Sequence, residues 1–195
     1  MNSQFEERFN LPNWSLYRED NFQFVPQGKI KVLQIGAYTG DTTQWLLSNR
    51  DVEFIDDVDI WDNLVHDGSQ GYDTVNMVNV EKLWDSRFAN NISVRKHKCT
   101  SDQFFNLLPK EPIYDFIYID GSHNALQTAL DGLNAFKVLK SGGIMAFDDY
   151  EWSFEKDNFL RPKRGIDAFI NVCGEKIKIV EVPNSQWKQK WIQKH

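Results

Sequence analysis

Short apolar runs alternate along the chain with segments that have helical periodicity. Runs rich in Val, Ile, Phe and Tyr that end at Gly or Asp are typical of buried strands. Because strands and helices alternate, we expect a mainly parallel sheet with helices packed on its faces. The predicted strands cover residues 29–35, 51–59, 92–97, 114–119 and 144–147.

Helical periodicity is clearest in residues 125–139, where five apolar side chains share one face. The Ser-Gly-Gly sequence at 141–143 is expected to end this helix. Ser101 is the expected N-cap of another helix at 102–108. Residues 60–79 show no sustained period, so we expect a long loop there. The shared face consists of Leu126, Leu130, Leu133, Phe136 and Leu139, and further helices are predicted at 40–48, 80–89 and 165–172.

The C-terminal part predicts an antiparallel hairpin. Residues 176–182 and 186–193 flank the turn sequence Pro-Asn-Ser at 183–185. Added to the five preceding strands, the hairpin completes an α/β fold with a doubly wound, mainly parallel seven-stranded sheet and a C-terminal antiparallel hairpin. We expect one such domain at 29–195, preceded by a lead-in at 1–28.

Composition limits the function classes without naming one. The chain has 195 residues, 41% hydrophobic and 26% charged, as in an ordinary single-domain globular protein. Lysine and arginine total 22 against 28 acidic residues, and the net charge of −6 disfavours a protein that neutralises many phosphates. No apolar run approaches the roughly 20 residues of a membrane helix, and the first ten residues do not resemble a secretory signal. Cys99 and Cys173 form no paired motif, so we expect a reducing, cytoplasmic setting.

Polar clusters follow the predicted parallel strands at the points where the strands end. In doubly wound sheets, ligands bind outside these carboxyl ends. We therefore expect the clusters to meet along one edge of the sheet and to form a ligand site. They comprise residues 36–40, Asp59, 100–102, 120–123 and 148–149.

The segment after the first strand has the spacing G-x-x-x-G, from Gly36 to Gly40. Glycines allow a tight turn and a close approach of backbone to ligand, and amides at the start of the next helix can hold an anionic group. A plain strand-to-helix turn explains the same pattern equally well. Asp59, at the end of the second strand, can accept hydrogen bonds from both hydroxyls of a ribose. The alternative is a solvated acid in an acidic stretch.

Three carboxylates follow the fourth and fifth strands, at Asp120, Asp148 and Asp149. Because like charges at one edge repel each other, a hard cation with oxygen ligands such as Mg²⁺ is their natural partner. Such an ion lowers the pKa of a substrate hydroxyl and orients it. His123 lies three residues after Asp120, and a histidine suits the uptake of that proton near neutral pH. Taken singly, these residues fit a helix cap or a turn acid, whereas their combination at consecutive strand ends favours a site.

Over residues 29–193 the chain resembles the Rossmann-like S-adenosylmethionine-dependent methyltransferases, whose fold carries a terminal antiparallel hairpin. The string Gly36-Ala37-Tyr38-x-Gly40-x-Thr42 is similar to the first motif of the catechol-type, metal-dependent O-methyltransferases. One position departs from that family, because Gln34 stands where an acid usually precedes the first glycine. The resemblance implies that S-adenosylmethionine contacts Gly36, Ala37, Tyr38, Gly40 and Thr42 at its methionine part, Asp59 at its ribose, Thr100, Ser101 and Asp102 at its adenine, and also Asp120.

For the catalytic residues, the resemblance implies a divalent metal, Mg²⁺, held by Asp120, Asp148 and Asp149. It implies His123 as the general base, at the offset where the catechol-type enzymes have a lysine. Related sugar O-methyltransferases of macrolide and aminocoumarin pathways place a His or an Asp in this short segment. The second Asp of the 148–149 pair is more similar to the sugar-modifying group. The expected activity is methyl transfer to a hydroxyl of a small molecule or sugar.

Other functions fit the sequence less well. A non-methylating member of the same fold, acting as a cofactor-binding or regulatory module, is the main alternative. A nicotinamide dehydrogenase is disfavoured because the third glycine of its motif is missing. Methylation of nucleic acid is unlikely because no Asn/Asp-Pro-Pro-aromatic motif follows the fourth strand and no broad basic stripe is present. The sequence leaves the acceptor's identity open, and also the oligomeric state, with a homodimer among the options.

Overall fold

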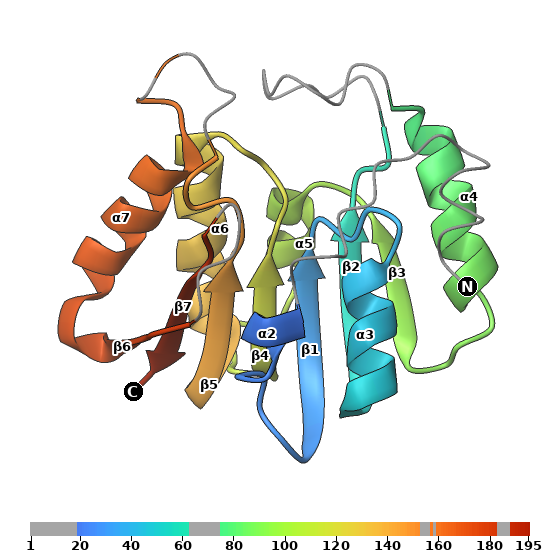
Figure 1. Cartoon of the computed structure of the whole chain (residues 1–195), viewed down its shortest axis with the longest axis horizontal. Coiled ribbons are helices and arrows are strands. Elements are labelled where there is room, and N and C mark those ends of the chain that lie inside the picture. Colours follow the sequence, from blue (N-terminus) through green and yellow to red (C-terminus); the bar gives the residue numbers. More distant parts are fainter. Residues whose placement is uncertain (1–18, 63–74, 153–156, 158, 183–187) are drawn as a thin grey trace.

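The computed structural model describes residues 19–62, 75–152, 157, 159–182 and 188–195. These residues form alternating strands and helices (Figure 1). The helices are α2 (Glu19–Phe22), α3 (Asp41–Asn49), α4 (Met77–Phe88), α5 (Ser101–Leu107), α6 (Ala125–Val138), α7 (Pro162–Cys173) and the 3₁₀ helix η2 (Gly174–Lys176). The strands are β1 (Lys29–Ile35), β2 (Asp51–Asp59), β3 (Val94–Lys98), β4 (Tyr114–Ile119), β5 (Leu139–Phe147), β6 (Ile177–Val180) and β7 (Lys190–Lys194).

The strands form one seven-stranded sheet in the order β3-β2-β1-β4-β5-β7-β6. Neighbours among the first five strands are parallel, whereas β7 is antiparallel to both β5 and β6. The predicted fold class is therefore confirmed, including the C-terminal antiparallel pair. The predicted bounds of β1, β2 and β4 coincide with the observed ones, and β1 and β4 are mainly apolar runs that end directly before a glycine or an aspartate. The predicted turn at 183–185 lies outside the described residues.

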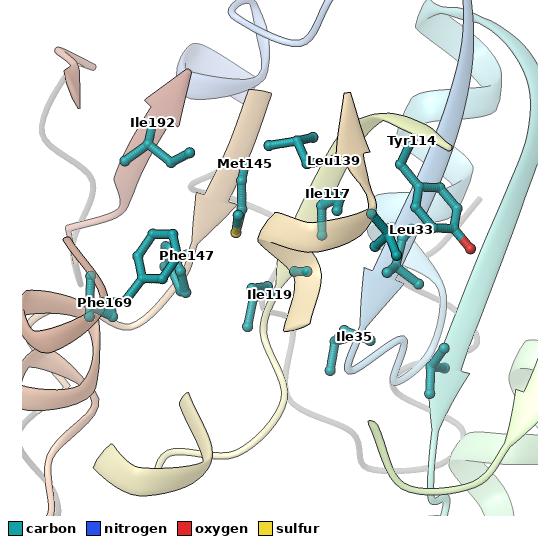
Figure 2. Packing of buried hydrophobic residues seen from close by; sticks show 14 of the residues in the cluster. Leu33, Ile35, Tyr114, Ile117, Ile119, Leu139, Met145, Phe147, Phe169 and Ile192 are labelled. Atoms are coloured by element: carbon teal, nitrogen blue, oxygen red, sulfur yellow. The ribbon is translucent and has the colours of Figure 1, made fainter. Parts of the chain in front are cut away.

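The sheet has a hydrophobic core on each face. One core packs β1, β4 and β5 against α5, α6 and α7, and Figure 2 shows Phe147 and Phe169 in contact within it. The other core packs the same strands against α2 and α3, with Phe22 and Leu46 fully buried. Coverage on both faces explains why the central strands are continuously apolar rather than alternating.

Part of the lead-in belongs to this second core. Phe22 and Val25 are buried in it. The guanidinium of Arg50 donates to the carbonyl oxygens of both residues, at 2.8 and 3.3 Å. The segment that precedes β1 is thus tied to the end of α3, while residues 1–18 lie outside the described part of the chain.

Several helix starts differ from the prediction, among them that of α7, which begins at Pro162 rather than at 165. Helix α4 begins at Met77, with the Asn76 side chain accepting from the amide of Asn79, so the expected loop at 60–79 ends earlier than predicted. Residues 63–74 of that loop lie outside the described residues. The N-cap of α5 is Thr100 rather than Ser101, because Thr100 forms a reciprocal capping box with Gln103.

The buried face of α6 also differs from the prediction. Of the expected apolar face, Leu126 and Leu130 are 70% and 38% exposed, whereas Leu133 and Phe136 pack partly buried against the core and Leu139 is fully buried. A side chain at Gly165 of α7 would overlap the backbone of Ala125, so α7 and α6 approach each other very closely. Only small residues allow that approach, and α6 therefore buries a different face, made of Thr128, Asp131, Gly132, Ala135 and Val138.

The Ser-Gly-Gly sequence does not end α6 but lies inside β5, which begins at Leu139. The register of β5 against β4 shifts between the pairs Tyr114–Leu139 and Phe116–Ile144. Gly142 has a φ of 79°, which a glycine adopts without strain, and it lies in this irregularity. The glycines thus mark a bulge in a strand rather than a helix stop. No helix among the described residues is long and apolar enough to cross a membrane.

Candidate active site

The C-terminal ends of β2, β1, β4 and β5 form one continuous edge, which we call the rim. The hydrogen bonds of the parallel sheet extend one residue past each strand end. The amides of Gly36, Asp120 and Asp148 donate to the carbonyl oxygens of Val58, Ile35 and Ile119, at 2.8 to 2.9 Å. The first residues of the predicted polar clusters are therefore fixed side by side by backbone bonds, as expected from the sequence.

The glycine loop makes the tight turn that its spacing predicts. Gly36 and Gly40 have φ values of 84° and 82°, and Tyr38 between them has a φ of 49°. A side chain at Gly36 would overlap the carbonyl oxygen of Asp120, and one at Gly40 would overlap the ring of Phe88. The glycines are thus required by contacts within the chain, which bring the loop after β1 directly against the loop after β4.

Around these glycines, the other residues of the motif are largely covered. Ala37 is 2% exposed, and Thr42 is buried in the first turn of α3. Tyr38 is half-buried.

Asp59 holds the glycine loop in place. Its carboxylate oxygens accept from the amides of Tyr38 and Trp61, both at 2.8 Å. The indole N–H of Trp61 in turn donates to the carbonyl oxygen of Tyr38 at 2.9 Å. Burial raises the pKa of Asp59, although the backbone amides that donate to it act in the opposite direction. Since each carboxylate oxygen has two lone pairs, Asp59 can accept ribose hydroxyls in addition to these amides.

A buried polar network below the loop was missed by the sequence prediction. Gln34 donates to the carbonyl oxygen of Gly36 at 3.2 Å and accepts from the hydroxyl of Thr43 at 3.1 Å. The same hydroxyl lies 2.7 Å from Asp57, to which Trp84 also donates at 2.8 Å. Burial raises the pKa of Asp57 to about 7, partly offset by these donors. The sequence carries no distinct signal for this network, because Asp57 is one of five acids in the nine residues of β2.

The start of α5 is connected to α6. Gln127 donates to the Ser101 hydroxyl at 3.2 Å and to Asp131 at 3.0 Å. Asp131 is 1% exposed, and burial raises its pKa to about 6. Ser101, Gln127 and the exposed Asp102 place hydroxyl, amide and carboxylate groups at the end of β3. Such groups can recognise the edge of an adenine, whereas the side chain of Thr100 is already used as the helix cap.

The catalytic residues predicted after β4 and β5 come together in part. His123 Nε2 lies 2.8 Å from Asp149 Oδ2. One potential ligand atom from each of Asp120, His123 and Asp149 lies within 4.8 Å of the others. The imidazole of His123 is 6% exposed and stacks on Trp152, with ring centroids 4.3 Å apart and planes at 18°. An imidazole paired with one carboxylate beside a second carboxylate can take up a proton or bind a divalent cation.

Asp148, the remaining expected metal ligand, is engaged elsewhere. Its carboxylate accepts from the hydroxyl of Tyr118, from the amide of Asp149 at 2.9 Å and from Gln189 at 3.4 Å. In the part of the chain that the structure describes, the group of three potential ligands includes His123 in place of Asp148.

Other titratable side chains have partners within the fold. Lys163, in the first turn of α7, binds Asp167 at 2.6 Å and donates to the hydroxyl of Tyr150 at 2.7 Å. His97, to which the sequence assigned no role, lies 2.7 Å from Asp56. His66 lies outside the described residues.

Comparison with known proteins gives one matching family and several solved structures with a similar fold. The model of the methyltransferase-domain family matches residues 33–150. The structure is similar to the N-methyltransferase NodS from Bradyrhizobium japonicum, solved with S-adenosyl-L-homocysteine, at 15% identity over 99% of this chain and 89% of that one, with a TM-score of 0.62. It is also similar to a proposed O-methyltransferase from Klebsiella pneumoniae, at 12% identity over 84% of this chain and 72% of that one, with a TM-score of 0.61. The SAH-bound Podospora anserina methyltransferase PaMTH1 is 16% identical over 85% and 71% of the two chains, with a TM-score of 0.58. Among curated proteins, no relative matches the sequence.

Proposed function

The chain belongs to the methyltransferase-domain family, with the class I S-adenosylmethionine-dependent fold, and from this premise we propose that it methylates a hydroxyl group of a small molecule or sugar. The observation that carries the proposal is the His123–Asp149 pair at the rim, 2.8 Å apart. This pair lies after the strands β4 and β5, next to the strand that carries the glycine loop. The imidazole of His123 therefore lies beside the predicted cofactor site. A base is useful there because methyl transfer to a hydroxyl releases the hydroxyl proton.

The residues at the rim fit S-adenosylmethionine. Asp59 offers carboxylate lone pairs to a ribose, and Ser101 and Gln127 offer a hydroxyl and an amide to an adenine. The glycine loop lies between these groups and Asp120. When bound, the cofactor supplies a methyl group on a positively charged sulfur, and the sulfur keeps the electron pair of the bond that breaks.

The role of His123 is to accept the proton of the acceptor hydroxyl while the new carbon–oxygen bond forms. In the tautomer in which Nε2 donates to Asp149, the basic lone pair lies on Nδ1. This atom is buried, so the acceptor must displace part of the cover over the ring to reach it. The carboxylate of Asp149 orients the ring and stabilises the imidazolium that results from proton uptake. Stacking on Trp152 restricts the ring further. The pair thus holds the proton that the acceptor loses.

We include a divalent ion such as Mg²⁺ in the proposal, with Asp120 and Asp149 as its ligands. These two carboxylates fit such an ion, because they are hard oxygen ligands and one oxygen of each lies within 4.8 Å of the other, while the imidazole of His123 beside them keeps its role as the base. A bound ion would lower the pKa of the acceptor hydroxyl and orient it. Asp148 is left out of the ligand set because its carboxylate is held by Tyr118 and Gln189.

Calorimetry with S-adenosylmethionine and S-adenosylhomocysteine, with and without Mg²⁺, tests the premise. We expect both molecules to bind in the absence of metal, and Asp59→Asn to weaken binding of each by about tenfold, the loss of roughly one charge-assisted hydrogen bond. The matched control is Asp115→Asn, at the opposite end of β4, which should bind both as the unchanged protein does. Absence of binding by the unchanged protein would leave only a non-methylating role for the fold.

Turnover then tests the finer part of the proposal. Formation of S-adenosylhomocysteine is followed with a mixture of catechols, phenols and sugars as acceptors. We expect the rate to fall on addition of EDTA and to return with Mg²⁺. An unchanged rate in EDTA would remove the metal from the proposal while leaving the base in place.

A further inference from the structure

A buried polar chain runs behind the rim, from the lead-in to the catalytic pair. Its members are Asn21, Gln189, Tyr118 and Asp148, of which the first three are 1%, 7% and 0% exposed. They come from α2, the segment before β7, β4 and the end of β5. Buried polar side chains are costly unless all their hydrogen bonds are made, so each contact in the chain constrains its neighbours.

The side-chain amide of Gln189 makes hydrogen bonds through both its nitrogen and its oxygen. Its Nε2 donates to the hydroxyl of Tyr118 at 3.1 Å and to Asp148 at 3.4 Å. Its Oε1 accepts from Asn21 and from the indole of Trp191, both at 2.9 Å. Reversal of the amide would place donors against donors, so the orientation of Gln189 is determined by its surroundings.

The hydroxyl of Tyr118 links the fixed amide of Gln189 to the carboxylate of Asp148. Because Gln189 donates to the phenol oxygen, the phenol proton is directed to Asp148 Oδ2, which accepts it in a hydrogen bond. The other oxygen, Oδ1, accepts from the backbone amide of Asp149 at 2.9 Å. The carboxylate of Asp148 is therefore fixed at both oxygens.

Asp149 adopts a backbone conformation that needs such support. Its φ of 55° lies in the left-handed region, which is unfavourable for a residue with a side chain. Three backbone amides donate hydrogen bonds in this turn: Asp149 N to the side-chain Oδ1 of Asp148, Tyr150 N to the Lys188 carbonyl at 3.0 Å, and Trp152 N to the Asp149 carbonyl at 2.9 Å. The conformation points the Asp149 carboxylate at His123.

We infer that Asp148 is a positioning residue, which holds Asp149 in the left-handed turn that orients His123, and that the Tyr118–Gln189–Asn21 chain fixes Asp148 for this purpose. The inference rests on the proposed function only for the use made of His123. The two adjacent aspartates then have different tasks: Asp149 contacts the imidazole, and Asp148 supports Asp149 from the core. Asn21, in α2 before β1, is then the most distant residue in the series of hydrogen bonds that leads to His123.

The test observes the side-chain N–H of His123 by nitrogen-15 NMR at one fixed pH, in the full-length protein without ligands. His123→Gln assigns the signal, and Asp149→Asn shows the spectrum without the carboxylate partner. We expect the N–H proton of His123 to exchange with solvent about tenfold faster in Asp148→Ala, as expected when one buried hydrogen bond weakens. Tyr118→Phe should have a smaller effect in the same direction, because it removes only the hydroxyl.

Two comparisons separate positioning from general destabilisation. Asp148→Asn keeps an oxygen that accepts from the Asp149 amide, so it should restore most of the slow exchange lost in Asp148→Ala. The matched control is Asp115→Asn, because Asp115 also accepts from a backbone amide, that of Lys31 at 2.9 Å, but at the opposite end of β4. This control should leave the His123 signal unchanged, with the backbone amide spectrum confirming that each variant is folded.

Exchange at the unchanged rate in both Asp148→Ala and Tyr118→Phe would overturn the inference, as would an equal effect of Asp115→Asn. Should Asp148→Ala not fold, Tyr118→Phe decides the matter, and unchanged exchange in that variant overturns the inference. Mn²⁺ binding that is lost in Asp148→Asn and retained in Tyr118→Phe would also contradict it, because Asp148 would then be a ligand. Failure of S-adenosylhomocysteine to bind would refute the proposed function alone, since the NMR measurement needs no cofactor.

Discussion

Two groups of aspartates lie on the same sheet, and each contains an aspartate paired with a histidine. Asp56 lies 2.7 Å from His97 in one group, and Asp149 lies 2.8 Å from His123 in the other. We call the first group the β2 aspartates and the second the rim aspartates. The β2 aspartates are Asp56, Asp57 and Asp59, and the rim aspartates are Asp120, Asp148 and Asp149.

The two pairs differ in what surrounds them. Asp56 lies within β2 and also accepts from the hydroxyl of Tyr114 at 2.9 Å, while the ring of His97 packs on Phe104 of α5. The first pair therefore joins strands and a helix of the scaffold. The second pair lies beyond the strand ends, in a turn with a left-handed residue and beside the carboxylate of Asp120. A histidine and an aspartate thus support the fold in the first pair and form a candidate base in the second.

The largest difference is expected between the two histidines. His123→Asn should lower methyl transfer by about 10² to 10⁴, the usual contribution of a general base, while His97→Asn changes it by about twofold at most. Both variants are assayed by formation of S-adenosylhomocysteine, with binding of that product as the check that each remains folded. Equal losses in the two variants would erase the distinction between the pairs.

The pH dependence of stability should be carried by the β2 aspartates, through Asp57. Its pKa is raised to about 7 by burial, so the neutral form stabilises the fold below about pH 4 and this contribution is lost as pH rises towards 7. The stability of the protein relative to Asp57→Asn should fall over this interval by up to about 4 kcal/mol. Urea unfolding at pH 4 and pH 8 measures it. A difference that is the same at both pH values would show that Asp57 is ionised throughout.

The affinity for a divalent ion should also differ between variants of the two aspartate groups, but by a smaller factor than the rate of methyl transfer. Asp120→Asn is expected to weaken Mn²⁺ binding by at least about tenfold, because it removes one charged oxygen ligand. Asp56→Asn, which removes a charge from the other group, should leave the affinity as it was. Electron paramagnetic resonance of free Mn²⁺ reports both. Identical affinities for the two variants would argue against the rim as the ion site.

The smallest effect is expected from Asp56→Asn on stability. The asparagine oxygen can still accept from Tyr114, but its amide cannot replace the carboxylate beside His97, so we expect a loss of about 1 to 2 kcal/mol in the free energy of unfolding. Turnover per folded molecule should be unchanged. A stable variant with impaired turnover would mean that the first pair also serves the reaction.

The presence of the strands and their parallel arrangement were accessible from the sequence, because apolar runs that end at Gly or Asp and alternate with helices are local signals. The buried face of α6 was not, because it depends on contacts with another helix. Leu126 and Leu130 give the stronger apolar stripe, yet the close approach of Gly165 to Ala125 buries the small residues instead. Likewise, Gly142 marks a bulge as readily as a helix end, and only pairing with β4 distinguishes the two.

At the rim, the sequence predicted which residues gather but not what each side chain contacts. The backbone register alone brings Gly36, Asp120 and Asp148 to one edge. The direction of the Asp148 carboxylate depends on Tyr118 and Gln189, which are 30 and 41 residues away along the chain. Adjacent aspartates carry no local signal for such a division of tasks.

The most direct test of the account uses S-adenosylmethionine with a carbon-13 methyl group and a mixture of catechols, phenols and sugars. The NMR spectrum of the products shows which atom receives the label. We predict an oxygen-bound methyl group with the unchanged protein and with His97→Asn, and a rate lower by about 10² or more with His123→Asn. A label on nitrogen or carbon, or equal rates with and without the His123 imidazole, would contradict the central claim that the Asp149–His123 pair takes the proton of a hydroxyl acceptor.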